Sequence, residues 1–257
     1  MPYRTLSVAA ESGVVTVTLA RPEARNAMDA QMRVDLAHAL RHAPEHGRAV
    51  VITGAGEDFC AGQELGDAAN LRDLDLGRTM REEMTPLLEA LRDCEVPVLA
   101  AVNGPAAGAG LALALAADLA VAAERASFAL PAARLGLPPD AGLSWILPRA
   151  LGPARAMGLA LLAEAIPAAQ AARWGLIWEA VPDDAFPARV AELARRLADG
   201  PTRAFAAARA LIRHGAGTWP EQLEREAEAQ AEAGRTLDFL EGALAHAEGR
   251  APAFRGL

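Results

Sequence analysis

The residues 134–148, RLGLPPDAGLSWILP, hold a single carboxylate, Asp140, in an otherwise largely apolar run. Burying an ionised carboxylate without a partner costs several kcal/mol, so such a residue usually has a structural or chemical role. In an apolar pocket its pKa would rise, which suits a general base that moves a proton. The alternative is a turn, in which Pro138 and Pro139 fix the backbone and Asp140 caps a nearby N–H.

Two glycine-rich turns are the second candidate for chemistry. Residues 54–65, GAGEDFCAGQEL, and 103–118, NGPAAGAGLALALAAD, each follow an apolar strand and lead towards a helix. Glycines allow a close backbone approach, and a helix N-terminus presents free N–H groups and partial positive charge. Neither turn is a nucleotide-binding fingerprint. Each alone would fit tight packing between strand and helix, but the pair favours a shared pocket for a phosphate or an oxyanion.

Strand-like and helical segments alternate around these turns, which predicts an α/β fold with crossover connections. The expected strands are residues 14–20, 48–54 and 96–104, and the expected helices are 29–43, capped by Asp29, and 80–94. The apolar run 111–123 predicts a buried helix, or a helix followed by a strand. Residues 66–78 are polar and weakly periodic, which predicts a loop or a short helix.

After about residue 200 the chain has no strand-like run. This predicts two parts: a core of residues 1–199 for binding and catalysis, and a helical oligomerisation region of residues 200–257. In the second region, apolar side chains recur on surfaces that a thin appendage cannot bury alone. They are Leu223, Leu237, Leu240 and Leu244.

The composition and the cysteine spacing argue against several classes of partner. The net charge is −8 and no run of arginines stands without interleaved Glu or Asp, so we expect no nucleic acid partner. Cys60 and Cys94 have no metal-ligand spacing, so we expect no metal and a reducing, cytoplasmic location. The first residues lack the pattern of a secretory signal. The longest apolar run is interrupted by Asp118 and is too short to cross a bilayer, so we expect no membrane partner.

Five segments resemble the crotonase family, also named the enoyl-CoA hydratase/isomerase superfamily. They are RPEARNAMD, ITGAGEDFCAGQEL, PVLAAVNGPAAGAGLALALAADL, SFALPAARLGLPPDAG and ARWGLIWEAV, in the order and spacing of that family. The resemblance implies a spiral of ββα turns with a C-terminal helical trimerisation region, assembled as a trimer or a dimer of trimers. It also implies an acyl-coenzyme A thioester as substrate. No separate cofactor is expected, because coenzyme A is part of that substrate.

The same resemblance assigns roles to residues. The thioester oxygen would lie between the backbone N–H groups of Gln63 and Ala109. Asp140 would face them across the acyl pocket, which Trp145 could line. Arg25, and Arg250 of a neighbouring subunit, match positions that contact coenzyme A phosphates. The remaining matched binding positions flank the two donors: Ala61, Gly62, Glu64, Leu65, Gly108 and Gly110.

The sequence departs from the hydratase pattern at two positions. Family hydratases carry two glutamates that activate water, and the matching residues here are Ala112 and Ala132. Neither can move a proton. Members that look like ring-1,2-epoxyphenylacetyl-CoA isomerases lack both glutamates and keep an aspartate at the place of Asp140. The resemblance therefore implies an isomerase that shifts a double bond or opens an epoxide ring through Asp140.

Other activities remain as alternatives. They are an enoyl-CoA hydratase or Δ3-Δ2-enoyl-CoA isomerase for aliphatic chains, and a catalytically silent acyl-CoA-binding homologue. A dehalogenase-type member is disfavoured, because the histidine that it needs is missing from the helix before residues 96–104.

Several residues also have structural interpretations. We interpret Glu64 as part of the loop structure, Cys60 as a buried hydrophobe and Asp118 as a cap or ion-pair residue. The tryptophans Trp145, Trp174 and Trp178 are interpreted mainly as core residues.

Overall fold

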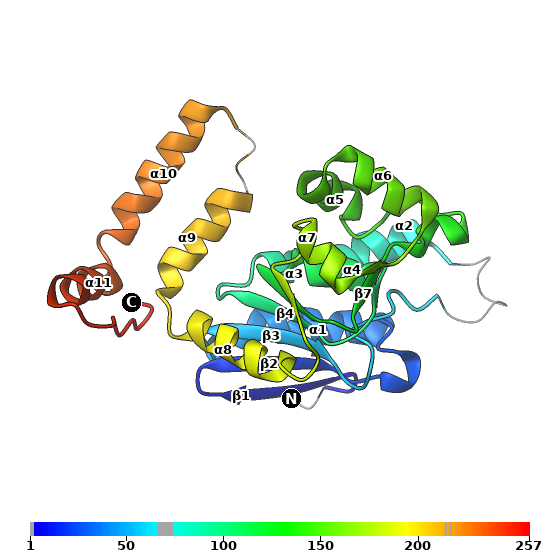
Figure 1. The fold of residues 1–257 in the computed structure, drawn as a ribbon, viewed down its shortest axis with the longest axis horizontal. Helices are drawn as coiled ribbons and strands as arrows, with labels where there is room; N and C mark the ends of the chain where they lie inside the picture. The colour runs from blue at the N-terminus through cyan, green and yellow to red at the C-terminus, as the bar shows by residue number, and fades with distance from the viewer. Residues whose placement is uncertain (1–2, 66–73, 214, 216) are drawn as a thin grey trace.

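The computed structural model describes residues 3–65, 74–213, 215 and 217–257. In this part of the chain, one sheet has the strand order β1-β2-β3-β4-β6-β9, and a small sheet has the order β5-β7-β8 (Figure 1). The strands of the large sheet are β1 (Leu6–Glu11), β2 (Val14–Leu19), β3 (Ala49–Gly54), β4 (Val98–Val102), β6 (Leu119–Ala123) and β9 (Glu179–Val181). Among the described strands of this large sheet, β1 and β2 pair antiparallel and all other neighbours pair parallel. The expected α/β fold with crossover connections is confirmed.

The sheet has a helical layer on each face. Helices α1 (Ala30–His42) and α3 (Thr85–Arg92) pack on the face that carries the main core. Helix α8 (Phe186–Ala198) packs on the other face, where its Phe186 and Leu193 join Val51, Leu99 and Val121 in a second apolar cluster. Burial on both faces explains why β3 and β4 are almost continuously apolar.

The expected helix at 29–43 is confirmed as α1. The Asp29 carboxylate accepts the Met32 N–H at 2.7 Å and caps the first turn. Met32, Leu36 and Leu40 recur every four residues, and all three are fully buried. Periodicity and capping therefore agree on the start of this helix and on its buried face.

The run 111–123 divides into a helix and a strand. Helix α4 (Ala109–Ala116) starts directly after Gly108, and β6 begins at Leu119. The small sheet lies beside the start of α4. Its strands are β5 (Ala106–Ala107), β7 (Ser127–Ala129) and β8 (Ile166–Pro167). The pairing of β5 with β7 brings the chain that leads to Asp140 next to the second glycine turn.

The expected single helix at 80–94 differs from the structure. After α2 (Leu76–Thr79), residues Met80–Met84 form a π-helical turn, and α3 starts at Thr85. Pro86 has no N–H to donate one turn back, so a regular α-helical ladder is interrupted there. The Thr85 N–H bonds instead to the Met80 carbonyl, which also accepts the Thr85 hydroxyl at 2.8 Å. The loop expected at 66–78 lies mostly outside the described residues.

The remaining helices lie at the margins of the sheet. They are the short η1 (Pro22–Ala24), η2 (Ala43–Glu45) and η5 (Pro131–Leu135), followed by α5 (Leu143–Leu151), α6 (Pro153–Leu162) and α7 (Ala168–Arg173). No helix in the described part of the chain combines the length and apolar character needed to cross a membrane.

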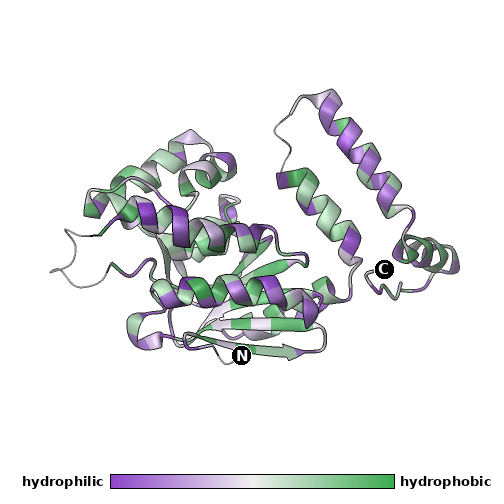
Figure 2. Cartoon of the chain, turned by 180° about the vertical axis from the view of Figure 1, so that it is seen from behind, coloured by the Kyte–Doolittle hydropathy of each residue, from purple (hydrophilic) through white to green (hydrophobic). Residues whose placement is uncertain are grey.

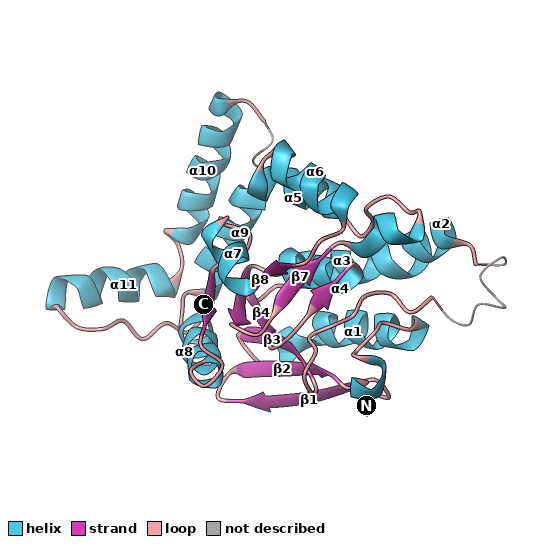
Figure 3. Ribbon diagram, turned by 45° about the vertical axis from the view of Figure 1, so that its right-hand side comes forward, coloured by secondary structure: helices cyan, strands magenta, loops and turns pink. Residues whose placement is uncertain are grey.

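The C-terminal region consists of α9 (Thr202–Arg213), α10 (Trp219–Ala233) and α11 (Leu237–Glu248). These helices extend away from the sheet (Figures 1 and 3). The predicted boundary at 199/200 falls between α8 and α9, and the division into two domains stays a prediction.

Asp118 connects this region to the core. Its carboxylate accepts the Val98 N–H at 2.7 Å and contacts Arg209 at 2.6 Å and Arg213 at 2.8 Å. The interpretation of Asp118 as an ion-pair residue is confirmed. Burial lowers the pKa of Arg213, while the Asp118 charge opposes this effect. One carboxylate therefore fixes the C-terminal half of α9 next to β4.

Apolar residues remain exposed on the C-terminal helices. In Figure 2 they stand among hydrophilic residues, and α10 is mostly hydrophilic. The exposed large apolar residues are Ile212, Trp219, Leu223, Leu237, Phe239, Leu240 and Leu244. This set includes all four leucines that the sequence pattern singled out as needing a partner surface.

Candidate active site

The two glycine turns lie side by side. A Cβ atom placed on Gly62 would lie 2.9 Å from the Ala107 carbonyl oxygen and 3.6 Å from the Ala109 nitrogen. The Ala107 N–H donates to the Cys60 carbonyl at 3.0 Å, so a backbone bridge joins the turns. The structure thus brings the backbone on either side of the two predicted donors, Gln63 and Ala109, into one place.

The first predicted donor, the Gln63 N–H, is left unused by the surrounding backbone. Met28 pairs with Gln63 as in a parallel sheet: its N–H donates to the Gly62 carbonyl at 2.8 Å, and its carbonyl accepts the Glu64 N–H at 3.1 Å. In such a bridge the N–H of the central residue points away from its partner. Within the described residues it has no acceptor. This N–H is therefore available to a ligand.

The second predicted donor opens α4. Ala109 is the first helical residue, so its N–H has no partner one turn back. Gly108 before it has φ +51°, where glycine is favoured, and a Cβ there would meet nothing within 4 Å. The side of the turn at Gly108 is consequently open. The positive end of the α4 dipole would favour negative charge on an oxygen bound there.

Cys60 and Gly110 hold the turns together. Gly110 packs so tightly on the Cys60 carbonyl that a side chain at 110 would collide with it. Burial raises the pKa of the Cys60 thiol to about 12, and the thiol accepts the Gly62 N–H. A thiol with that pKa stays protonated at neutral pH and is a poor nucleophile. The interpretation of Cys60 as a buried hydrophobe is confirmed by its burial.

Asp140 lies in the loop between η5 and α5, directly before the buried Ala141 and Leu143. Its side chain is partly buried, and this burial raises the pKa of the carboxyl group above its ordinary value. Among the described residues no cation pairs with it. Gly142, the residue at the N-cap of α5, receives no side-chain cap either. The Asp140 carbonyl accepts the Leu143 N–H at 2.9 Å, so the residue opens a turn, and its carboxylate bonds its own backbone N–H. The catalytic role and the turn-cap role of Asp140 both stay predictions.

The two alanines at the hydratase positions offer no proton-transfer group. Ala112 is fully buried in α4, one turn after Gly108, whose carbonyl accepts the Ala112 N–H at 3.0 Å. Ala132 lies in η5 and packs against the core. In this region of the described structure, Asp140 is the carboxylate that carries a burial-induced rise in pKa.

Residues flanking the first donor have structural contacts. Glu64 forms an ion pair with Arg21 at 2.7 Å, in agreement with its interpretation as part of the loop structure. Arg25 forms a fork with Asp58, with Nη2 at 2.7 Å from the carboxylate, and its exposed side chain leaves it accessible to a ligand. Ala61 donates its N–H to the Arg25 carbonyl at 3.0 Å. Leu65 is partly buried at the end of this described segment.

Two buried asparagines were not identified from the sequence. Asn26 has φ +55° and donates its side-chain amide to the carbonyls of Ala55 and Asp58. Asn103 accepts the Gly54 N–H at 3.0 Å and donates to the Gly56 carbonyl. Together they satisfy backbone groups of the first glycine turn. The only signal in the sequence is that asparagine is typical of turns, and Asn103 stands at the end of an expected strand, directly before a glycine.

The core interpretation is wrong for two of the three tryptophans. Trp145 and Trp178 are 52% and 62% exposed, whereas Trp174 packs against the core. The Arg149 guanidinium stacks on the Trp145 ring at 3.9 Å, so part of this indole is covered by a side chain of its own helix. The predicted role of Trp145 in lining an acyl pocket stays a prediction.

Arg250 is not brought to this site within one chain. It follows α11, and Figure 1 shows α11 and α4 on opposite sides of the molecule. Arg250 pairs with Glu241 and Glu248, each at 2.6 Å. These ion pairs hold it at the end of the chain. Its predicted contact with coenzyme A bound to a neighbouring subunit stays a prediction.

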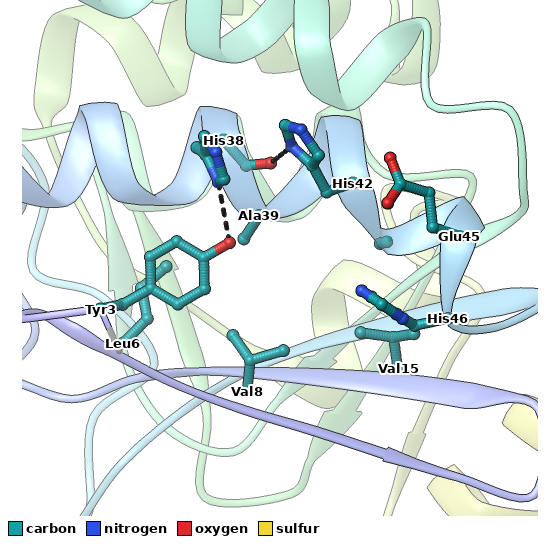
Figure 4. A pocket seen from close by; sticks show the side chains of 10 residues that line it. Tyr3, Leu6, Val8, Val15, His38, Ala39, His42, Glu45 and His46 are labelled. Atoms are coloured by element: carbon teal, nitrogen blue, oxygen red, sulfur yellow. Dashed lines mark hydrogen bonds between the residues drawn. The ribbon is translucent and has the colours of Figure 1, made fainter. Parts of the chain in front are cut away.

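A separate cavity of about 580 Å³ lies between α1 and the β1–β2 hairpin (Figure 4). His38, His42 and His46 line it, and the Tyr3 hydroxyl lies 3.0 Å from His38 Nδ1. None of the predicted site residues lines this cavity. Within the described residues, no group of three or more histidine, cysteine or acidic side chains is placed to bind a metal ion.

Comparison with known proteins decides the family. The model of the family Enoyl-CoA hydratase/isomerase matches residues 9–256. The chain belongs to the enoyl-CoA hydratase/isomerase family. This assignment confirms the crotonase resemblance and makes the protein an enzyme of the crotonase family.

Relatives of this enoyl-CoA hydratase/isomerase family member carry different names. A protein of Rhodobacter capsulatus named probable enoyl-CoA hydratase is 50% identical over 257 residues, 100% of both chains. The 1,2-epoxyphenylacetyl-CoA isomerase of Escherichia coli is 42% identical over 253 residues, 96% of each chain. A crystal structure of a putative enoyl-CoA hydratase/isomerase from Mycobacterium abscessus has a TM-score of 0.91 at 39% identity, covering 98% of this chain and 100% of that one. The crotonase fold is thereby confirmed.

Proposed function

We propose that this enzyme isomerises acyl-coenzyme A thioesters, with Asp140 as the single proton-transfer group. The observation that carries the proposal is the partly buried Asp140 carboxyl group, which forms no ion pair among the described residues and whose pKa is raised by burial. The alanines at 112 and 132 leave no second carboxylate to activate water. The name of the Escherichia coli relative supports an isomerase, and we take 2-(1,2-epoxyphenyl)acetyl-CoA as one candidate substrate.

In the proposed reaction, the thioester oxygen accepts hydrogen bonds from the N–H groups of Gln63 and Ala109. The Asp140 carboxylate removes a proton from the acyl chain, and the resulting negative charge resides on that oxygen as an enolate. Asp140 then returns the proton at a different carbon, so a double bond shifts with no net gain or loss of protons. With an epoxide substrate, Asp140 would remove a proton from the carbon next to the thioester while an epoxide C–O bond breaks and its electron pair stays on the oxygen. Asp140 would then return the proton to that oxygen, so no proton is gained or lost.

The relative from Rhodobacter capsulatus favours a second candidate, because it is named a probable enoyl-CoA hydratase. A hydratase requires a group that activates water for addition to the double bond. If this chain hydrates enoyl-CoA, a residue other than those at positions 112 and 132 must do so. A silent acyl-CoA-binding homologue is the third candidate, and it would not need Asp140.

Product analysis tests the three candidates. The purified enzyme would be offered crotonyl-CoA, straight-chain 3-enoyl-CoAs and epoxyphenylacetyl-CoA, and the products would be separated by mass spectrometry. We expect isomers from at least one substrate class and negligible hydration of crotonyl-CoA, because Ala112 and Ala132 cannot move a proton. Hydration at about 10 per second or faster would contradict this expectation. Binding without any turnover would favour the silent homologue.

We further propose that the enzyme assembles as a trimer or a dimer of trimers through its C-terminal helices. Exposed apolar residues on α10 and α11, such as Leu223, Leu240 and Leu244, support this proposal because association would remove them from water. Light scattering at micromolar concentration should give the mass of three or six chains. A monomeric mass under these conditions would refute the proposal.

A further inference from the structure

Two arginines donate hydrogen bonds to backbone carbonyls next to the Gln63 donor. Arg21 donates from Nη1 to the Ala27 carbonyl at 2.8 Å and pairs with Glu64 at 2.7 Å. Arg33 donates from Nη1 to the Met28 carbonyl at 2.7 Å. That carbonyl also accepts the Glu64 N–H. Guanidinium groups therefore hydrogen-bond to backbone carbonyls at and next to the bridge that orients the Gln63 peptide.

Arg33 is the buried member of the pair, with only 6% of its side chain exposed. Its Nε and Nη2 atoms both donate to the same Glu83 oxygen, at 2.9 and 2.5 Å. Every guanidinium nitrogen of Arg33 is therefore engaged. Because a buried charge is costly unless it is paired and hydrogen-bonded, this arrangement strongly favours one geometry.

Glu83 belongs to the π-helical turn of Met80–Met84, between α2 and α3. Through Glu83 and Arg33 this turn is connected to the Met28 carbonyl, and through Met28 to the backbone on both sides of Gln63. A π-helical turn displaces the residues that follow it relative to a regular helix, and such turns are frequent at functional sites. Here the turn supplies the counter-ion of a buried arginine that supports the predicted oxyanion donor.

We propose that Arg33 and Glu83 are positioning residues for the Gln63 N–H, and that they are needed to stabilise the enolate more than to bind the substrate. The inference rests on the proposed function, since it takes Gln63 as an oxyanion donor. Donors of this kind act by being fixed where charge develops, and small displacements cost rate steeply. Binding of coenzyme A involves the rest of the ligand and should depend less on one peptide orientation.

Conservative variants test what Arg33 and Glu83 contribute to turnover and to substrate binding. Arg33→Lys keeps the charge but cannot reach both the Met28 carbonyl and Glu83 with a planar fork. Glu83→Gln keeps an acceptor oxygen but removes the counter-charge. The matched controls are Arg78→Lys and Glu82→Gln, because Arg78 of α2 and Glu82 of the same π-helical turn form an exposed ion pair at 2.7 Å.

The measurements are the turnover of isomerisation, the Kd of a saturated acyl-CoA, and the infrared stretch of its ¹³C-labelled thioester carbonyl when bound. Hydrogen bonds to the carbonyl lower this frequency. We expect Arg33→Lys to lower turnover about tenfold or more and to reduce the frequency shift, with Kd changing by less than about twofold. Glu83→Gln should act in the same direction, and the control variants should match the wild type.

Different failures of the experiment refute different statements. A wild-type frequency shift and turnover in folded Arg33→Lys and Glu83→Gln variants would overturn the inference, as would a loss of affinity equal to the loss of turnover. If Arg33→Lys does not fold by circular dichroism, Glu83→Gln decides alone. A wild-type enzyme that binds acyl-CoA with the frequency shift but isomerises nothing would overturn the proposed reaction, and the carbonyl shift would still test the pair.

Discussion

Replacing Asp140 by asparagine should lower isomerisation turnover by about 10²–10⁴-fold, the usual contribution of a general base. The variant keeps the size of the side chain but removes the group that accepts the proton. Affinity for the acyl-CoA thioester should change little, because the proposed binding contacts are main-chain N–H groups and the coenzyme moiety. Steady-state turnover and thioester affinity, measured on the same preparation, provide the check.

The turn-cap alternative predicts a different outcome for the same variant. Asparagine caps turns and helices nearly as well as aspartate, so turnover would persist. Asp199→Asn is a suitable control, since Asp199 is an exposed carboxylate at the C-terminal end of α8. Near-normal turnover of Asp140→Asn, together with unchanged affinity, would reject the catalytic role.

The same substitution should affect stability in a pH-dependent manner. Burial raises the pKa of Asp140 in the folded state, so the folded protein binds this proton more tightly than the unfolded chain. The free energy of unfolding therefore decreases as pH rises from the ordinary carboxyl pKa through the raised value. At neutral pH, Asp140→Asn should have a higher Tm than the wild type, and the difference should disappear below the ordinary carboxyl pKa. An unchanged Tm at neutral pH would argue against a desolvated carboxylate.

Replacing Gly110 by alanine should lower turnover by about 10²–10³-fold, the effect of losing one oxyanion donor. The added methyl group would collide with the Cys60 carbonyl, and this backbone contact holds the two glycine turns together. The collision can be relieved only by moving α4 away from the first turn. Such a movement would separate the N–H groups of Gln63 and Ala109.

Gly158→Ala is the matched control for that experiment. Gly158 lies inside α6, and a Cβ there would meet nothing within 4 Å. Alanine is also the better helix former, so the control should keep its turnover and have a Tm equal to or above that of the wild type. If Gly110→Ala folds and keeps normal turnover, the tight contact between the two turns is not required for catalysis.

Much of the frame could be predicted from local sequence patterns. Helix α1 could be predicted from the four-residue spacing of Met32, Leu36 and Leu40 and from the cap at Asp29. Both signals depend only on residues that are close in the sequence. The two glycine turns were found for the same reason. The close approach of the two turns depends on parallel strand pairing, which local patterns do not reveal. The two oxyanion donors, Gln63 and Ala109, were assigned from the family resemblance and not from periodicity.

The residues that the sequence did not reveal act over long distances in the chain. Arg33 meets Glu83 only because α1 packs against the helices that follow residue 74, and a single arginine inside a helical pattern looks like a surface residue. The π-helical turn depends on how Pro86 interrupts the ladder. The exposure of Trp145 could not be inferred from its size and apolar character. It depends on which face of α5 carries the residue, and there Arg149 covers one side of the ring.

The ion cluster at Asp118 also bears on how copies of the chain would meet. Because Arg209 and Arg213 are both held on this carboxylate, the first C-terminal helix leaves the core in one orientation within a single chain. Association through these helices would then lose less conformational entropy than the docking of a freely swinging arm. In the proposed assembly, a preorganised arm of this kind would let a modest apolar surface support stable association, and it would set the angle at which a second copy arrives.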